Sequence, residues 1–283
     1  MKKETILLTG GTGFIGRHVL SILLADGFNV RLITRGLSRE IGRNREGIEI
    51  VSTDNAFLES REWWTKQCAG VNRVIHLAWY VEPGQYLNSL KNLECLTGSL
   101  NLALAGIASG ISKFVGVGTC FEYDLEDSMP KDSDSKLNPN TIYASAKASL
   151  YFLLKNLFTL SKIDFAWARL FYLYGQGEDE RRLTPYLHRQ LSNGLIAELT
   201  SGNQIRDFID VKLAAQQIVE ATFNSATGSI NICSGKGISI RQFAEEIADL
   251  YGAHDLLKFG ARQDNITDPQ YVVGSLKMVK GGK

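Results

Sequence analysis

The sequence has 283 residues, of which 44% are hydrophobic and 22% are charged, and its formal net charge is +1. Such a chain can bury a large core without disulfide support, and it lacks the basic stripe of a nucleic-acid-binding protein. No apolar run approaches membrane-spanning length, so we expect no membrane partner.

The spacing of the cysteines indicates a reducing compartment, and the spacing of cysteines and histidines together indicates no metal site. Cys68, Cys95, Cys120 and Cys233 share no metal or redox spacing, and the four histidines are equally scattered. The N-terminus leads into only a short apolar run, which is typical of a first strand and not of a signal peptide. We therefore predict a cytoplasmic protein with no metal site.

The first predicted strand, residues 5–9, leads into a glycine-rich turn at residues 9–16, and a segment with helical periodicity follows. Strand, turn and helix in this order are the context of a dinucleotide-binding motif. Gly10 suits the sharp turn, Gly13 lets a pyrophosphate approach, and Gly16 lets the helix pack on the strand. The N–H groups of the first helical turn would face the phosphates. The predicted cofactor contacts here are Gly10, Gly13, Phe14, Ile15 and Gly16.

The second predicted strand, residues 29–34, ends at a cation. An NAD-binding chain usually places Asp or Glu there, to accept hydrogen bonds from the ribose 2′-hydroxyl. Here Arg35 follows, with Arg39 and Arg43 close behind. A guanidinium matches a phosphate bidentately, so we predict NADP in preference to NAD. The alternative is that Arg35 is a solvated loop charge.

Further apolar strands alternate with helical stretches, which predicts an α/β fold with a doubly wound parallel Rossmann sheet. Helices over 85–109 and 143–161 should cover the same face of that sheet. The polar stretch 124–141 is expected to be a loop over the active site that can close on substrate. The remaining predicted strands are 48–52, 73–78, 113–118 and 165–170.

Tyr143 and Lys147 lie four residues apart and share one face of a predicted helix. A nearby cation lowers the pKa of a phenol toward the working pH, so Tyr143 could give a proton to a carbonyl oxygen as hydride arrives. Lys147 could also bind the nicotinamide ribose. Thr119 ends the strand at 113–118, where carboxyl ends of parallel strands face the crevice. We predict Thr119, Tyr143 and Lys147 as the catalytic residues.

The predicted domains are interleaved. Residues 1–171 and 205–233 would form the dinucleotide-binding domain, and residues 172–204 and 234–283 a smaller substrate-binding domain. Ser239 is expected to cap an amphipathic helix in the smaller domain.

Together these motifs resemble the extended short-chain dehydrogenase/reductase family, the NAD-dependent epimerase/dehydratase group that acts on nucleotide sugars. The likeness covers nearly the whole chain, and its segments keep the family's order. They are residues 9–16, 76–78, 118–123, 143–147, 169–175, 206–211 and 231–232.

The resemblance implies further contacts. For the cofactor these are Asp54 at the adenine, the main chain of Leu77 and Ala78 along the ribose and pyrophosphate, and Phe171. Arg206 would grip the substrate diphosphate with its fork of donors. The family also implies a homodimer through helices 85–109 and 143–161. The substrate contacts implied are Tyr80, Thr119, Cys120, Tyr172 and Arg206.

Departures from the family narrow the expected reaction. Its 4,6-dehydratases place an acid directly after the catalytic threonine, whereas this chain has Cys120 and Phe121. Its epimerase-reductases of fucose nucleotides carry a cysteine where Phe121 stands. Tyr172 replaces the usual asparagine. The resemblance is therefore strongest to the 4-ketoreductases of deoxy-sugar nucleotides.

The sequence thus predicts NADPH-dependent reduction of the keto group of a nucleoside-diphosphate 4-keto-6-deoxy sugar, a step toward surface-polysaccharide precursors. One alternative is a 4-epimerase with retained NAD, which oxidises and re-reduces the same carbon. The other is a non-catalytic, cofactor-sensing scaffold on the same fold.

Overall fold

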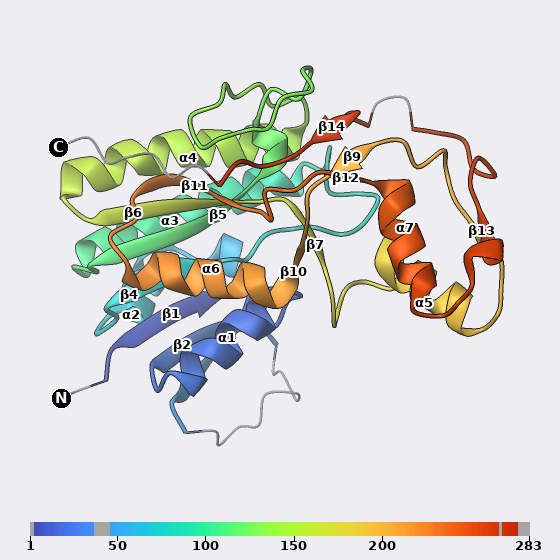
Figure 1. The fold of residues 1–283 in the computed structure, drawn as a ribbon. Coiled ribbons are helices and arrows are strands. Elements are labelled where there is room, and N and C mark those ends of the chain that lie inside the picture. Colours follow the sequence, from blue (N-terminus) through green and yellow to red (C-terminus); the bar gives the residue numbers. More distant parts are fainter. Residues whose placement is uncertain (1–2, 37–45, 266–267, 277–283) are drawn as a thin grey trace.

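The fold is built on one parallel sheet. The structure, a computed structural model, describes residues 3–36, 46–265 and 268–276. Within these residues seven strands form the central sheet, and every pair is parallel, as predicted (Figure 1). The strand order is β11 (Gly228–Ile232), β6 (Asp164–Leu170), β5 (Lys113–Thr119), β4 (Arg73–His76), β1 (Thr5–Thr9), β2 (Asn29–Arg35) and β3 (Ile48–Thr53).

Helices cover both faces of the sheet, so its strands are buried on both sides. Ile6 and Leu8 of β1 face one core, whereas Leu7 between them faces the other. Figure 1 shows α1 and α6 on one face and α3 and α4 on the opposite face. The first layer is α1 (Gly16–Ala25) and α6 (Val211–Phe223), and the second is α2 (Arg61–Cys68), α3 (Lys91–Ala108) and α4 (Ile142–Ser161).

The predicted strands and helices match the structure within a few residues, except at one helix start. The helix predicted over 85–109 begins only at Lys91. Residues 82–90 form turns around Pro83 and Gly84, where Gly84 has φ +77° and proline cannot donate to a helical ladder. The helix predicted at 143–161 begins one residue earlier, at Ile142, where Thr141 accepts a hydrogen bond from the Ala144 N–H.

A third, smaller hydrophobic cluster lies beside the carboxyl edge of the sheet. It packs α5 (Leu183–Ser192) against α7 (Ile240–Asp249), and Ser239 caps α7 as expected. Within the described residues, short strands form three further small sheets, two of two strands and one of three. They are formed by β7 (Tyr172–Tyr174), β8 (Ala197–Glu198), β9 (Ile205–Arg206), β10 (Phe208–Asp210), β12 (Ile238–Ser239), β13 (Leu257–Lys258) and β14 (Tyr271–Val272). Three short 3-10 turns are η1 (Ala56–Leu58), η2 (Cys120–Glu122) and η3 (His254–Leu256).

The polar stretch 124–141 is a loop, but its middle is tied down. The Asn231 side-chain amide donates to the Lys131 carbonyl at 2.7 Å, and the Lys131 N–H donates to the Val273 carbonyl at 2.9 Å. The Ser229 hydroxyl donates to the Ser133 carbonyl at 2.8 Å. Because these contacts fix the loop to β11 and the chain after β14, the expectation of a loop free to close on substrate is wrong for its middle.

The helices of the described residues are too short or too polar to cross a membrane.

The packing of α3 on η1 depends on Gly98. An added Cβ there would lie 2.4 Å from the Phe57 Cα, so Gly98→Ala should lower the free energy of unfolding by about 1–3 kcal/mol through overpacking. Gly106→Ala in the same helix is the control, because its methyl meets only the flexible tip of Ile111. Urea unfolding measures both variants. Equal stabilities would contradict the close approach.

Candidate active site

The glycine turn fits a dinucleotide. A Cβ on Gly10 would lie 2.7 Å from the Ala78 N, and one on Gly16 would lie 2.0 Å from the Gly10 O, so neither position accepts a side chain. Gly13 is exposed, directly before the start of α1, where a helix N-terminus favours an anion. The N–H groups of Leu77 and Ala78 donate to Thr9, which joins the β4 end to the turn. Phe14 and Ile15 lie half-buried in the turn, as cofactor contacts would.

Arg35 and Asp54 lie at the same edge of the sheet. Arg35 pairs in register with Thr53, directly before Asp54, and both side chains are exposed. A cation therefore ends β2, and its contact with the adenosine ribose of a bound dinucleotide stays a prediction. Arg39 and Arg43 lie outside the described residues.

Thr119 is held by the turn that follows β5. Its N–H donates to Glu122 Oε1 at 2.9 Å, and its Oγ1 accepts from the Phe121 N–H at 3.3 Å. The Thr119 side chain also acts to lower the pKa of the Tyr143 phenol, so these two predicted catalytic groups lie close together. This reciprocal capping fixes the Thr119 hydroxyl at the sheet edge.

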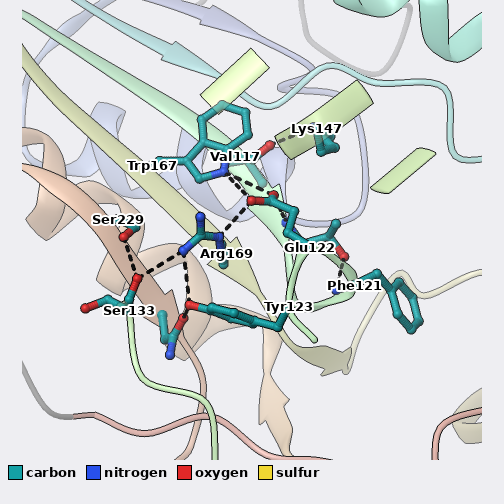
Figure 2. Close-up of polar contacts among 11 residues, drawn as sticks. Val117, Phe121, Glu122, Tyr123, Ser133, Lys147, Trp167, Arg169 and Ser229 are labelled. Carbon is teal, nitrogen blue, oxygen red and sulfur yellow. Dashed lines mark hydrogen bonds and ion pairs between the residues drawn. The ribbon is translucent and has the colours of Figure 1, made fainter. Parts of the chain in front are cut away.

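A buried ion pair supports that turn. Arg169 Nε donates to Glu122 Oε2 at 2.7 Å, and the two side chains are 1% and 0% exposed. The Trp167 indole donates to the same carboxylate at 3.1 Å, and Arg169 Nη1 reaches the Tyr123 hydroxyl and the Ser133 carbonyl (Figure 2). The carboxylate, the guanidinium and the indole of this network therefore each have hydrogen-bond partners, as a buried charge requires.

Tyr143 is nearly buried and remains protonated. Its pKa is raised by burial and then by the nearby Tyr86 phenol. The Tyr86 ring lies 4.9 Å from the Tyr143 ring, edge to face. The expectation that Lys147 lowers this pKa is wrong for the geometry observed, because the lysine is directed elsewhere.

Lys147 is 3% exposed, and its Nζ donates to the Val117 carbonyl at 2.6 Å (Figure 2). The ammonium also lies 3.8 Å from the Trp79 ring centroid. Burial lowers the pKa of Lys147 to about 7, while Glu122 opposes that shift. Its ammonium form is therefore sensitive to its neighbours near neutral pH.

Three predicted substrate residues gather beyond Thr119. Burial raises the pKa of the Cys120 thiol to about 12, so it is neither acid nor base at neutral pH. The Arg206 guanidinium lies 5.2 Å from the Tyr172 ring. Its Nη2 donates to Asp268 at 2.8 Å and its Nη1 to the Ile205 carbonyl, so a diphosphate would have to share or replace Asp268.

Two predicted contacts lie at the margins of the site. Tyr80 is at the rim, with Lys91 Nζ 4.7 Å from its ring centroid. Phe171 is 5% exposed and belongs to a buried cluster with Cys120 and Cys233, so its side chain offers little surface to a cofactor.

Sequence reasoning missed three side chains around Tyr143: Trp79, Tyr86 and Asn92. Trp79 and Tyr86 both contact the Tyr143 ring. Asn92 is fully buried and accepts a hydrogen bond from the Trp79 indole at 2.7 Å. The position of Trp79 directly after Leu77 and Ala78 was the signal that could have found it.

Comparison with known proteins identifies the family. The model of the NAD dependent epimerase/dehydratase family matches residues 6–233. The chain belongs to this family. It is therefore an enzyme of the extended short-chain dehydrogenase/reductase type, as predicted.

Similar family members act on sugar nucleotides, by their names. The dTDP-6-deoxy-L-talose 4-dehydrogenase (NAD(+)) of Aggregatibacter actinomycetemcomitans is 28% identical, over 85% of this chain and 88% of that protein. The CDP-abequose synthase of Salmonella typhimurium is 26% identical, over 98% and 92%. Among solved structures, the UDP-N-acetylglucosamine 4-epimerase of Methanobrevibacter ruminantium M1, in complex with UDP-N-acetylmuramic acid, has a TM-score of 0.87 and 26% identity, over 98% and 90%.

The ion pair behind Thr119 gives a testable prediction. Glu122→Gln should lower the free energy of unfolding by about 3–5 kcal/mol, because it leaves Arg169 charged and unpaired in the core. The control is Glu49→Gln at the ion pair with Arg31, where the carboxylate is 57% exposed and the loss should be about 0–1 kcal/mol. Denaturant unfolding compares them, and equal losses would contradict the supporting role.

Proposed function

We propose that this enzyme uses NADPH to reduce the keto group of a nucleoside-diphosphate 4-keto-6-deoxy sugar. The observation that carries the proposal is the proximity of Thr119 and Tyr143 at a sheet edge where no carboxylate stands at the two positions directly after Thr119. The positions after it are the buried thiol Cys120 and the apolar Phe121. Neither can act as the acid or base that elimination of water needs.

The names of the relatives support the substrate class. A dTDP-6-deoxy-L-talose 4-dehydrogenase acts on a 6-deoxy sugar nucleotide at carbon 4. Run in reverse, such a dehydrogenation is the reduction of a 4-keto group. We infer that the substrate of this chain is likewise a sugar nucleotide.

The side chains suit reduction. A bound dihydronicotinamide would supply a hydride to the keto carbon. The Thr119 hydroxyl then holds the keto oxygen, and Tyr143 gives that oxygen its proton. Because the pKa of Tyr143 is raised by burial, the phenol is protonated at neutral pH, which suits a proton donor. Lys147, one helical turn from Tyr143, would add a positive charge to this part of the site when it is protonated.

In this proposal residues 172–204 and 234–283, which include the smaller cluster of α5 and α7, bind the substrate. Residues 1–171 and 205–233 bind the dinucleotide. Arg206 packs on Tyr172, and it would bind the diphosphate there. Arg182, the residue before α5, acts electrostatically on Tyr86 and is a second candidate for the same anion.

A 4-epimerase with retained NAD is the second candidate. It is favoured by the structural similarity to a UDP-N-acetylglucosamine 4-epimerase, with a TM-score of 0.87. An epimerase would interconvert two sugar nucleotides without net consumption of NADPH.

We also propose a cytoplasmic homodimer through α3 and α4. The four cysteines are all buried and free, in keeping with a reducing compartment. Large apolar side chains are exposed on the two helices and could be covered by the same helices of a second copy. They are Leu93, Phe152, Leu153 and Leu160.

Replacement of Tyr143 by Phe tests the proton donor. It should reduce turnover by about 10²–10⁴-fold through loss of general acid catalysis, while the thermal shift caused by the cofactor is retained. Tyr151→Phe on the same helix is the control, because its ring packs in the core. Undiminished turnover in Tyr143→Phe would refute the mechanism.

Arg35 determines the predicted cofactor preference. NADP should stabilise the protein more than NAD, and Arg35→Ala should weaken NADP binding about tenfold or more through loss of a charge-assisted contact, leaving NAD binding unchanged. A thermal-shift titration measures this, with Arg189→Ala on α5 as the control. NAD binding as tight as NADP binding would contradict the preference.

A further inference from the structure

The ammonium of Lys147 lies against an aromatic face. Its Nζ is 3.8 Å from the centroid of the Trp79 ring, and the Val117 carbonyl accepts its hydrogen bond at 2.6 Å. Among the ion pairs of the described residues, none includes Lys147. A carbonyl dipole and an indole face therefore take the place of a carboxylate partner.

The indole is fixed in this position by a buried amide. The Trp79 Nε1–H donates to Asn92 Oδ1 at 2.7 Å. The Asn92 Nδ2 donates in turn to the main-chain carbonyls of Tyr86 and Ser89, at 2.6 and 2.8 Å. Since Asn92 is fully buried and both ends of its amide are used, it holds the indole plane in one orientation.

Trp79 also contacts the phenol. Its ring centroid lies 6.5 Å from that of Tyr143, with an interplanar angle of 73°. One indole thus touches both members of the Tyr/Lys pair.

We propose that Trp79 is a positioning residue for the reduction, whose indole face keeps Lys147 charged and directed at the Val117 carbonyl beside Tyr143. This rests on the proposed function only where it concerns turnover. The electron-rich face of an indole attracts an ammonium, and the attraction is stronger where water is excluded.

Titratable groups on η2, α3 and β4 interact with this ammonium. Glu122 of η2 and Cys95 of α3 favour its charged form. His76 of β4 is held neutral, because burial lowers its pKa to about 3 and Lys147 acts in the same direction. Tyr143 lies on the same helix as Lys147 and stays protonated.

The sign of the effect follows from the charge. Trp79 stabilises the ammonium form, so a side chain without an aromatic face should lower the pKa of Lys147. The shift should be about 1 pH unit, from the strength of a desolvated cation–π contact. The ammonium would then be lost at lower pH, and the alkaline limb of kcat/KM would move down with it.

The test measures the lysine directly. Protein labelled with ¹³C at lysine Cε is titrated by NMR, and Lys147→Arg assigns the resonance. Trp79→Leu and Trp79→Met, of which methionine fills more volume, should titrate about 1 pH unit below wild type. Trp79→Phe keeps an aromatic face and should restore part of the shift. Trp63→Leu, at a partly buried tryptophan of α2, is the control and should titrate as wild type.

The two proposals can fail separately. If Lys147 titrates as in wild type in both Trp79→Leu and Trp79→Met, the inference is wrong, whatever the substrate. If the titration moves as expected but the wild type reduces no keto sugar nucleotide, the inference stands and the proposed function fails. Where the wild type is active, an alkaline limb that stays in place in both variants would also overturn the role in turnover.

Discussion

The carboxylate of Glu122 and the guanidinium of Arg169 form the contact on which the rest of the site depends. Both are buried, so each needs its full set of partners, and those partners come from separate parts of the chain. The carboxylate fixes the main chain of Thr119 and the indole of Trp167, while the guanidinium reaches the loop at Ser133. The demand of one charge pair for hydrogen bonds thus connects β5, β6 and the polar loop (Figure 2).

The same carboxylate is the largest favourable influence on the Lys147 ammonium. The anion therefore has two roles, since it holds the turn after β5 and it offsets part of the cost of burying a cation beside Tyr143. Around this centre the phenol stays protonated, the thiol of Cys120 stays protonated and His76 stays neutral. At neutral pH these three side chains therefore each stay in one protonation state.

The sequence predicted the parts of the fold that local chemistry dictates. The glycine turn, the alternation of apolar strands and helices, and the Tyr143 helix follow from residues within a few positions of each other, so their spacing could be read. The predicted start of α3 was wrong because a turn at Pro83 and Gly84 precedes the helix, which begins only at Lys91. The pKa of Tyr143 and the anchoring of the 124–141 loop depend on burial and on partners such as Asn231, far away in sequence. The spacing of residues along the sequence does not predict contacts between distant residues. The contact of Trp79 with Lys147 was missed for the same reason.

Arg206 and Asp207 are neighbours in the sequence, but their side chains have different partners. Asp207, between β9 and β10, is fully buried and accepts hydrogen bonds from the N–H groups of Ser234, Gly235 and Gly274. It therefore fastens its segment to the chain that follows β11 and to the chain that follows β14. Its neighbour Arg206 packs instead on Tyr172, beside Asp268. Glu122 and Thr119 form a similar pair. The buried Glu122 carboxylate holds the main chain of Thr119, and the Thr119 side chain lies in the predicted site. In both places the acid is the anchor, and its removal would displace the functional group without touching it. The acids of these two motifs are therefore required by the architecture, and the predicted site residues Thr119 and Arg206 stand beside them.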